Sequence, residues 1–218
     1  MKYYPISLDI SNKRCTVIGG GDVAERKVRR LLDCGARVTV VGKRLSPKLK
    51  DLKARKRIEH IASDYRSECV SGSFIVIGAT DNVRVNGRIY RDAKKKGILV
   101  NIVDDPEHCD FILPSLMERG DLSISVSTAG KSPALARKLR MELEGRYGHE
   151  YEILIRIMGM LRKRVMRRGR SSEENREIFE VVVNSDILEK IRAKDWDGVR
   201  MRIKELTGEV IVDFITGE

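Results

Sequence analysis

Small residues at positions 19, 21 and 24 form the most chemically informative pattern in the chain. Gly19, Gly21 and Ala24 have the G-x-G-x-x-G/A spacing, in which the first glycine permits a tight turn and the second lets a pyrophosphate approach the backbone. The free N–H groups and positive dipole of the helix that follows favour an anionic ligand. We therefore expect a dinucleotide phosphate at Gly19 and Gly21, with Asp22 and Val23 beside it. A tight turn that binds nothing is the alternative.

The residues around this turn supply the structural context that the pattern requires. Residues 14–18 are extended and apolar, residues 24–32 carry apolar side chains at helical spacing, and Gly35 is a natural helix stop before a second apolar run at 37–41. Strand, helix and strand within about thirty residues form a βαβ unit. This context favours the ligand-binding interpretation. Gly20 is expected only to fill space.

The end of the second predicted strand lacks the acid that usually binds the adenosine ribose. Residues 42–44 are glycine, lysine and arginine. Lys43 and Arg44 could accept the 2′-phosphate of NADP, or they could form a solvated turn.

Further alternating elements predict an α/β protein with a parallel, doubly wound Rossmann-type sheet. Strands are expected at 58–61, 74–79 and 98–103, and helices from Ser46-Pro47 to about 55 and from residues 80–82 to Gly97. Ligands of such sheets bind beyond the carboxyl ends of the strands. Thr80-Asp81-Asn82 and Asp104-Asp105-Pro106 are therefore expected to line a crevice.

The pattern changes after residue 110. Residues 111–117 and 122–126 predict two strands joined by a turn, and Ser132-Pro133 predicts the start of a helix that reaches about residue 147. Gly130-Lys131-Ser132 is not a phosphate loop, because Ser125 stands where that motif needs its first glycine. From Tyr151 the pattern is helical to the end.

Composition limits the class of protein. The 218 residues are 41% hydrophobic, enough for one large domain or a medium domain with a smaller one. No apolar run approaches the ~18 residues of a membrane helix, and no signal region follows Met1, so a cytoplasmic protein without a membrane partner is expected. The four cysteines form no C-x-x-C pair, so neither a metal site nor a disulfide framework is expected. Cys15 and Cys34 are expected to pack as small apolar residues.

The net charge of +11 favours an anionic partner. Only 5% of the residues are aromatic and no nucleic-acid motif is present, so nucleic acid is not the expected partner. The densest basic run, residues 162–170, is either a solvated helix end or a surface that contacts an anionic substrate.

Several segments, in the same order along the chain, resemble the precorrin-2 dehydrogenase and sirohydrochlorin ferrochelatase family, the N-terminal module of sirohaem synthases. The similarity is tightest over residues 1–147. It rests on Val17-Ile18-Gly19-Gly20-Gly21-Asp22-Val23-Ala24-Glu25-Arg26-Lys27, Ala79-Thr80-Asp81, Asn101-Ile102-Val103-Asp104, Phe111-Ile112-Leu113-Pro114-Ser115 and Gly130-Lys131-Ser132-Pro133.

This resemblance implies three domains: an NAD-binding Rossmann domain at 1–112, a dimerisation unit of two strands and a helix at 113–147, and a helical domain at 148–218. It implies a homodimer that oxidises precorrin-2, a tetrapyrrole with eight carboxylates, to sirohydrochlorin with NAD+. Some members then insert Fe2+ to give sirohaem. The tail is too short for the methyltransferase module of fused members, so precorrin-2 is expected to come from another protein.

The resemblance also assigns site residues. The catalytic acid of the family falls on Asp104, where a carboxylate can accept the proton that leaves with the hydride. Cofactor binding falls on Gly19, Gly21, Asp22, Val23, Lys43, Arg44, Thr80 and Asp81. Family members commonly lack an acid after the second strand, which favours NAD+ over NADP. The alternative function is a non-catalytic NAD(P)-sensing regulatory module that binds an anionic partner.

Overall fold

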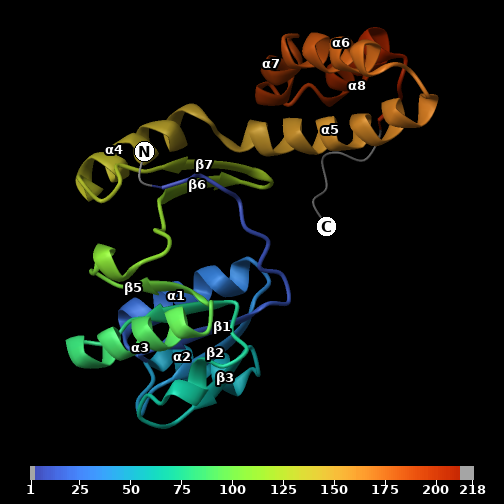
Figure 1. Cartoon of the computed structure of the whole chain (residues 1–218). Coiled ribbons are helices and arrows are strands. Elements are labelled where there is room, and N and C mark those ends of the chain that lie inside the picture. Colours follow the sequence, from blue (N-terminus) through green and yellow to red (C-terminus); the bar gives the residue numbers. More distant parts are fainter. Residues whose placement is uncertain (1–2, 212–218) are drawn as a thin grey trace. The chain divides into compact units, whose positions relative to one another are not determined.

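The chain, seen here in a computed structural model that describes residues 3–211, divides into two compact units. The first unit spans residues 1–113 and the second spans residues 114–218 (Figure 1). The expected division into three domains, at 1–112, 113–147 and 148–218, stays a prediction.

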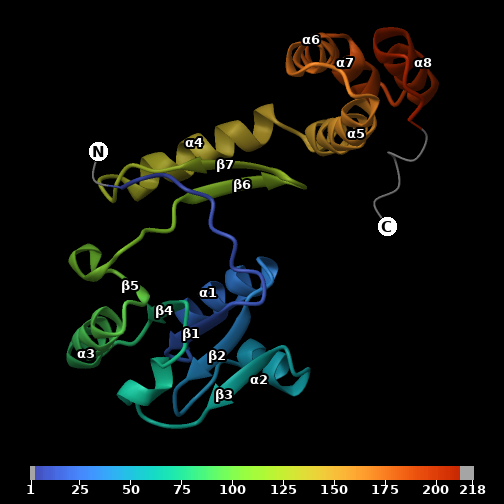
Figure 2. The same ribbon diagram turned by 45° about the vertical axis from the view of Figure 1, so that its right-hand side comes forward.

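The first unit is built on a parallel sheet of five strands (Figure 2). The order is β3-β2-β1-β4-β5, and the parallel sheet of a Rossmann-type fold is as predicted. The strands are β1 (Arg14–Ile18), β2 (Arg37–Val41), β3 (Ile58–Ile61), β4 (Ile75–Gly78) and β5 (Leu99–Ile102). The chain runs outward from β1 to β3 and then crosses back to β4, so the boundary between β1 and β4 is the topological switch point at which such sheets bind ligands.

Helices cover both faces of this sheet. On one face, α1 (Asp22–Asp33) and α2 (Pro47–Ala54) pack against strand side chains such as Val17 and Val40. On the other, α3 (Val83–Lys95) and the 3-10 turn η1 (Ser67–Val70) pack against Ile18 and Val76. Because both faces are buried, the strands read as nearly continuous apolar runs in the sequence.

The predicted helix caps are present in the first unit. The Ser46 hydroxyl accepts a hydrogen bond from the Leu49 N–H at 3.2 Å, and the Asn82 side chain accepts one from the Val85 N–H at 3.1 Å. Gly97, with a φ of +65°, follows the end of α3 as expected.

The second unit begins with an antiparallel hairpin of β6 (Ser115–Arg119) and β7 (Leu122–Val126), against which α4 (Pro133–Arg146) packs. The first strand of this hairpin starts later than the predicted residue 111. Pro114 lies just before it, and a proline has no N–H to donate to a strand ladder. Phe111 instead packs on the core of the first unit's sheet.

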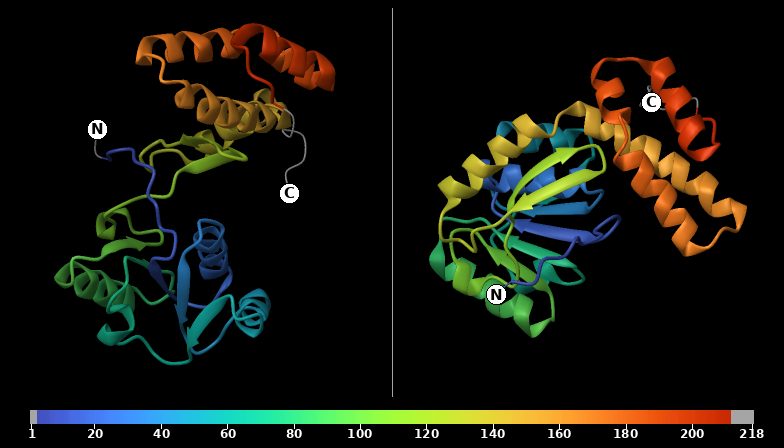
Figure 3. Two further views of the ribbon diagram at one scale, coloured as in Figure 1. Left: turned by 90° about the vertical axis from the view of Figure 1, so that its right-hand side faces the viewer. Right: turned by 90° about the horizontal axis from the view of Figure 1, so that it is seen from above.

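The remaining helices share one hydrophobic core (Figure 3). They are α5 (His149–Val165), α6 (Ser172–Val183), α7 (Ile187–Arg192) and α8 (Trp196–Thr207), with the 3-10 turn η3 (Met166–Arg168) after α5. Ile157 and Leu161, predicted on the apolar face of α5, are fully buried. The prediction of helix to the end of the chain was wrong for residues 208–211, because Gly208, with a φ of +69°, ends α8. Residues 212–218 lie outside the described residues.

The basic run at 162–170 contributes to the packing of this helical core. The Arg162 guanidinium lies over the Phe179 ring, the Arg164 side chain donates to the Val210 carbonyl, and Arg168 pairs with the buried Glu209 carboxylate at 2.7 Å. The three arginine side chains are exposed, so these contacts lie on the surface of the second unit.

The cysteines differ in their surroundings. Cys15 is fully buried, and burial raises the pKa of its thiol to about 11. Cys34, at the end of α1, is exposed, so the prediction that it packs in the core was wrong. Within residues 3–211 no three histidine, cysteine, aspartate or glutamate side chains gather as metal ligands, and no helix is long and apolar enough to cross a membrane.

A buried carboxylate joins α1 to the loop between β2 and α2. Glu25 on α1 accepts a hydrogen bond from the Ser46 hydroxyl at 2.8 Å and lies within 3.5 Å of the Lys48 and Arg29 cations. The Ser46 hydrogen bond, helped by these cations against the effect of burial, lowers the pKa of Glu25 below its ordinary value of 4.5. A depressed pKa means that this carboxylate stabilises the fold in its ionised form.

We expect Glu25→Gln to lower the thermal unfolding midpoint at pH 7, because the amide carries no charge for Lys48 and Arg29. The difference from wild type should begin to shrink as the pH falls below 4.5, where Glu25 of the unfolded chain becomes protonated, and should disappear once the pH is below the lower pKa of Glu25 in the folded protein. Circular dichroism melts between pH 7 and pH 3.5 measure this. Glu177→Gln, at an exposed position on α6, is the control. An equal deficit at both pH values would contradict the assignment.

Candidate functional site

Backbone hydrogen bonds bring the carboxyl ends of the central strands to one edge of the sheet. The Gly19 N–H donates to the Val41 carbonyl at 2.9 Å, and the Ala79 N–H donates to the Ile18 carbonyl at 2.7 Å. The turns that follow β1, β2 and β4 therefore begin side by side. This edge carries most of the residues that the sequence singles out.

The three glycines of the turn have different roles. Gly19 has a φ of +121°, and a Cβ there would overlap the Ala79 carbonyl. A Cβ on Gly20 would overlap the carbonyl of Arg44, and the Gly20 carbonyl accepts a 2.7 Å hydrogen bond from the Ser46 N–H. Gly20 is therefore a close-contact position, and the expectation that it only fills space was wrong. A Cβ on Gly21 would meet no atom within 4 Å, so this position is open on the side from which a ligand can approach.

The start of α1 fits an anionic group. Gly21 is the N-cap residue, and no side chain caps the first turn. The amide N–H groups of Asp22 and Val23 have no acceptor within the helix at this position, as is true of any helix start. Uncapped N–H groups beside an open glycine are the arrangement that binds a dinucleotide pyrophosphate.

The basic turn after β2 lies against the glycines. The Arg44 carbonyl lies against Gly20. The side chains of Lys43 and Arg44 are exposed. The Lys43 ammonium pairs with Asp64 at 2.8 Å. The pair is solvent-exposed, so it contributes little to the stability of the fold. It does place the Asp64 carboxylate beside the Lys43 ammonium.

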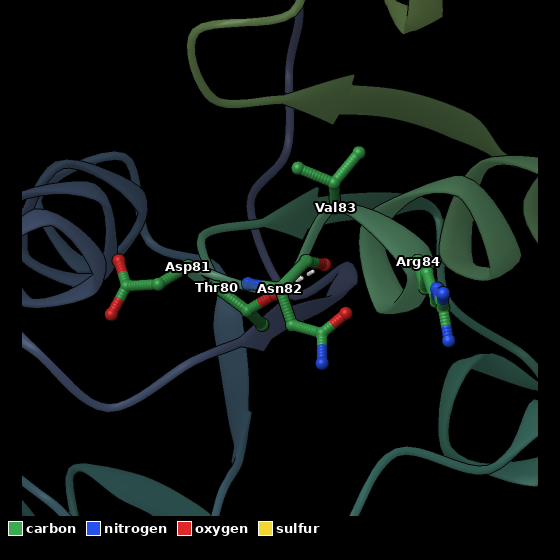
Figure 4. A pocket seen from close by; sticks show the side chains of 5 residues that line it. All are labelled: Thr80, Asp81, Asn82, Val83 and Arg84. Carbon is green, nitrogen blue, oxygen red and sulfur yellow. Dashed lines mark hydrogen bonds between the residues drawn. The ribbon is translucent and has the colours of Figure 1, made fainter.

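The turn after β4 forms an open hollow of about 670 Å³, lined by residues 80–84 (Figure 4). The side chains of Asp81 and Arg84 extend from it in opposite directions, and Val83 projects separately. The hollow is shallow and open to solvent, as suits one wall of a crevice rather than an enclosed pocket.

Asn86, which the sequence analysis missed, holds this turn in place. The Thr80 hydroxyl donates to Asn86 Oδ1 at 2.7 Å, and Asn86 Nδ2 donates to the Thr80 carbonyl at 2.9 Å. Asn86 is only 9% exposed and lies on the buried face of α3 with Ile89 and Ala93. A polar residue at the spacing of that apolar face was the available signal.

Asp104 is exposed and stands two residues beyond β5 with a φ of +60°. The Val103 N–H donates to the Gly78 carbonyl at 2.9 Å, and Gly78 pairs with Ile102 in the sheet. The Asp104 segment therefore leaves the sheet beside the turn that contains Thr80. A non-glycine residue in the left-handed region costs ~1 kcal/mol and is best tolerated by Asp and Asn.

Lys27 is the second residue that the sequence analysis missed. Burial and the neighbouring Arg26 lower the pKa of this lysine, while the charge of Asp104 acts in the opposite direction. Lys27 on α1 is thus close enough to Asp104 to sense its charge. It follows Ala24 by one helical turn, so its place near the glycine turn was visible in the sequence, although its partner was not.

Together these observations place the predicted residues along one edge of the first unit. Each predicted group follows the carboxyl end of a strand. The groups are the glycine turn with Asp22 and Val23, the turn with Lys43 and Arg44, the turn with Thr80 and Asp81, and Asp104. The arrangement can hold the phosphates of a dinucleotide at α1 and present the Asp104 carboxylate at the same edge of the sheet, with β4 between them.

Comparisons with known proteins agree with this arrangement. A family described as putative NAD(P)-binding matches residues 6–115, and one described as sirohaem biosynthesis protein central matches residues 119–146. The chain is 39% identical over 194 residues to siroheme synthase 3 of Aeromonas hydrophila, covering 89% of this chain and 42% of that protein. It is 34% identical over 214 residues to siroheme synthase 2 of Yersinia enterocolitica, covering 98% and 45%. The chain thus spans less than half the length of these curated relatives.

Among solved structures, SirC, a precorrin-2 dehydrogenase, superposes with a TM-score of 0.79 at 22% identity, covering 93% of this chain and all of that one. At this identity the likeness concerns the fold, and it includes both units. The family resemblance drawn from the sequence motifs is confirmed. With residues 6–115, half of its length, matched, the chain belongs to the family described as putative NAD(P)-binding.

Proposed function

We propose that this protein oxidises precorrin-2 to sirohydrochlorin with NAD+, and that it can then insert Fe2+ to give sirohaem. The observation that carries this is the placement of the uncapped α1 start and of Asp104 at the same edge of the sheet, beyond the ends of β1 and β5 on either side of β4, in a chain similar to siroheme synthases over most of its length. The fold that it shares with a precorrin-2 dehydrogenase supports the same activity.

The proposed reaction removes a hydride and a proton from the tetrapyrrole. Bound NAD+ supplies the hydride acceptor. Asp104 accepts the proton from the adjoining ring position, because its carboxylate is exposed and stands beyond the end of β5. In chelation, the same carboxylate takes protons from pyrrole nitrogens as Fe2+ enters.

The residues proposed to bind the cofactor follow from the geometry of the turns. Gly21, Asp22 and Val23 offer backbone N–H groups to the pyrophosphate, and Gly19 allows the turn. Lys43 and Arg44 lie near the adenosine ribose, and Thr80 and Asp81 border the nicotinamide end. NAD+ is the proposed cofactor, because the Lys43 charge already has the Asp64 carboxylate as its partner, and because the family commonly lacks an acid here.

We expect Asp104→Asn to reduce precorrin-2 oxidation by about a hundredfold or more, the usual contribution of a general base, with NAD+ affinity unchanged. Asparagine keeps the size of aspartate and tolerates the left-handed backbone, so the loop should hold its conformation. The measurement is anaerobic formation of sirohydrochlorin from precorrin-2, with NAD+ and NADP+ compared, followed by addition of Fe2+.

The matched control is Glu107→Gln on the same loop, at an exposed position. Retained turnover in Asp104→Asn would remove this residue from the mechanism. A wild-type protein that binds NAD+ but turns over no precorrin-2 would favour the regulatory alternative. Iron insertion no faster than in the absence of protein would exclude the chelatase step alone.

A pair of glycine variants separates ligand binding from folding. Gly21→Ala should leave the unfolding midpoint unchanged, because the added methyl meets no atom, but should weaken NAD+ binding by occupying the side on which the pyrophosphate approaches. Gly20→Ala should cost about 1–3 kcal/mol of stability, because the methyl overlaps the Arg44 carbonyl. Thermal melts and NAD+ titration calorimetry test both. Tight NAD+ binding by Gly21→Ala would place the pyrophosphate elsewhere.

We also propose that the second unit forms a homodimer through α4 and its hairpin. Three apolar side chains on α4 are largely in solvent: Leu135, Leu139 and Met141 are 47%, 38% and 54% exposed. Met141 lies in an open hollow with the charged side chains of Arg137 and Lys138 around it. Apolar side chains rimmed by charge are typical of a surface that a partner covers.

Met141→Glu should therefore shift the sedimentation mass from twice the 24.8 kDa chain toward a single chain, since covering an ionised carboxylate at the interface costs desolvation free energy. Met201→Glu, at a 63% exposed position on α8, should leave the mass unchanged. A wild-type protein that sediments as a monomer at micromolar concentration would contradict the proposal.

A further inference from the structure

The loop that carries Asp104 folds back onto the strand from which it leaves. β5 is an edge strand of the sheet, so one side of its backbone has no neighbouring strand. The Asp110 N–H donates to the Val100 carbonyl at 2.8 Å, and the Asp110 carboxylate accepts from the Val100 N–H at 3.1 Å. Lys94 pairs with the same carboxylate at 2.6 Å. Residues 103–110 therefore form a closed loop with both ends attached to β5.

The thiol of Cys109 makes the attachment nearest to Asp104. Its sulfur accepts from the Ile102 N–H at 3.2 Å and from the Asn101 side-chain amide at 3.4 Å. The Ile102 carbonyl at 3.2 Å and the Asp105 carbonyl at 3.1 Å both lie within reach of the S–H group. A thiol has one proton, so it donates to one of these carbonyls at a time.

These partners bracket Asp104 in the chain. Ile102 precedes it by two residues and Asp105 follows it directly, and both are held by one sulfur atom. The buried Asn101 extends the attachment, because its amide also donates to the Phe111 carbonyl at 3.0 Å. The far side of the loop is fixed separately by the pair between His108 and Asp105 at 2.7 Å.

Asp104 needs such a constraint because its backbone is in the left-handed region, with a φ of +60°. A free loop would relax toward the commoner right-handed or extended conformations, which would turn the carboxylate away from its present direction. The direction of a proton acceptor matters, since a displacement of ~1 Å can slow a reaction by about a hundredfold.

We propose that Cys109 is a positioning residue for Asp104: its thiol fastens the backbone on both sides of Asp104 to β5 and so aims the carboxylate. This inference rests on the proposed function for its effect on turnover. The attachment itself is a property of the loop and can be measured without substrate.

Cys109→Ala removes every hydrogen bond of the thiol, whereas Cys109→Ser keeps a donor and an acceptor at the same atom. We expect the alanine variant to lose about tenfold or more in kcat for precorrin-2 oxidation, with unchanged NAD+ affinity, and the serine variant to recover most of that loss. Cys34→Ala, at an exposed cysteine on α1's end, is the matched control and should behave as wild type. Wild-type kcat in Cys109→Ala would overturn the proposal, as would a loss that serine does not restore.

Amide hydrogen exchange provides the readout that needs no activity. In Cys109→Ala the Ile102 N–H loses its acceptor, so exchange across residues 102–105 should accelerate, and Cys109→Ser should slow it again. Exchange at α3 should stay unchanged, which separates a local release of the loop from general unfolding. If the wild-type protein fails to oxidise precorrin-2, the proposed function is wrong, but the exchange experiment still tests the attachment of the loop. Unaltered exchange at residues 102–105 in Cys109→Ala would overturn the inference.

Discussion

The close approach of three backbone segments at the glycine turn is the constraint on which the rest of the first unit depends. The carbonyls of Ala79 and Arg44 occupy the space where side chains at Gly19 and Gly20 would lie. These contacts bring the turns after β1, β2 and β4 together without any side chain between them. A dinucleotide can then meet backbone N–H groups directly, since the open position at Gly21 is the one left free.

The turns around this contact are each held by a buried polar side chain from a neighbouring helix or strand. Ser46 and Glu25 hold the turn after β2, Asn86 holds the turn after β4, and Asn101 with Cys109 holds the loop after β5. Turns that carry function have few apolar contacts of their own, so their geometry must come from such hydrogen bonds. The sheet is the rigid part of the unit, and the hydrogen bonds of these side chains hold the exposed turn residues in fixed positions relative to it.

Much of this architecture could be predicted from the sequence because it follows from local patterns. The alternating strands and helices, the caps at Ser46 and Asn82 and the position of Asp104 beyond β5 depend on apolar periodicity, glycine spacing and capping chemistry, all of which act over a few residues. The roles of Gly20, Lys27 and Asn86 depend on residues far away in the chain. No local pattern reveals that the Arg44 carbonyl lies on Gly20, or that a lysine on α1 senses a carboxylate beyond β5. Cys34 shows the same limit, because its small apolar side chain gave no sign that the end of α1 faces solvent.

The return of the Asp104 loop along β5 also has a consequence for the solubility of the protein. An unpaired strand edge offers free N–H and C=O groups to any other extended chain, and sheets with bare edges tend to aggregate. Here Asp110 occupies the N–H and carbonyl of Val100, and Cys109 occupies those of Ile102. The segment that presents the carboxylate therefore also shields this edge of the sheet. Substitutions that loosen it would therefore change two properties at once, the direction of the Asp104 carboxylate and the exposure of the β5 edge.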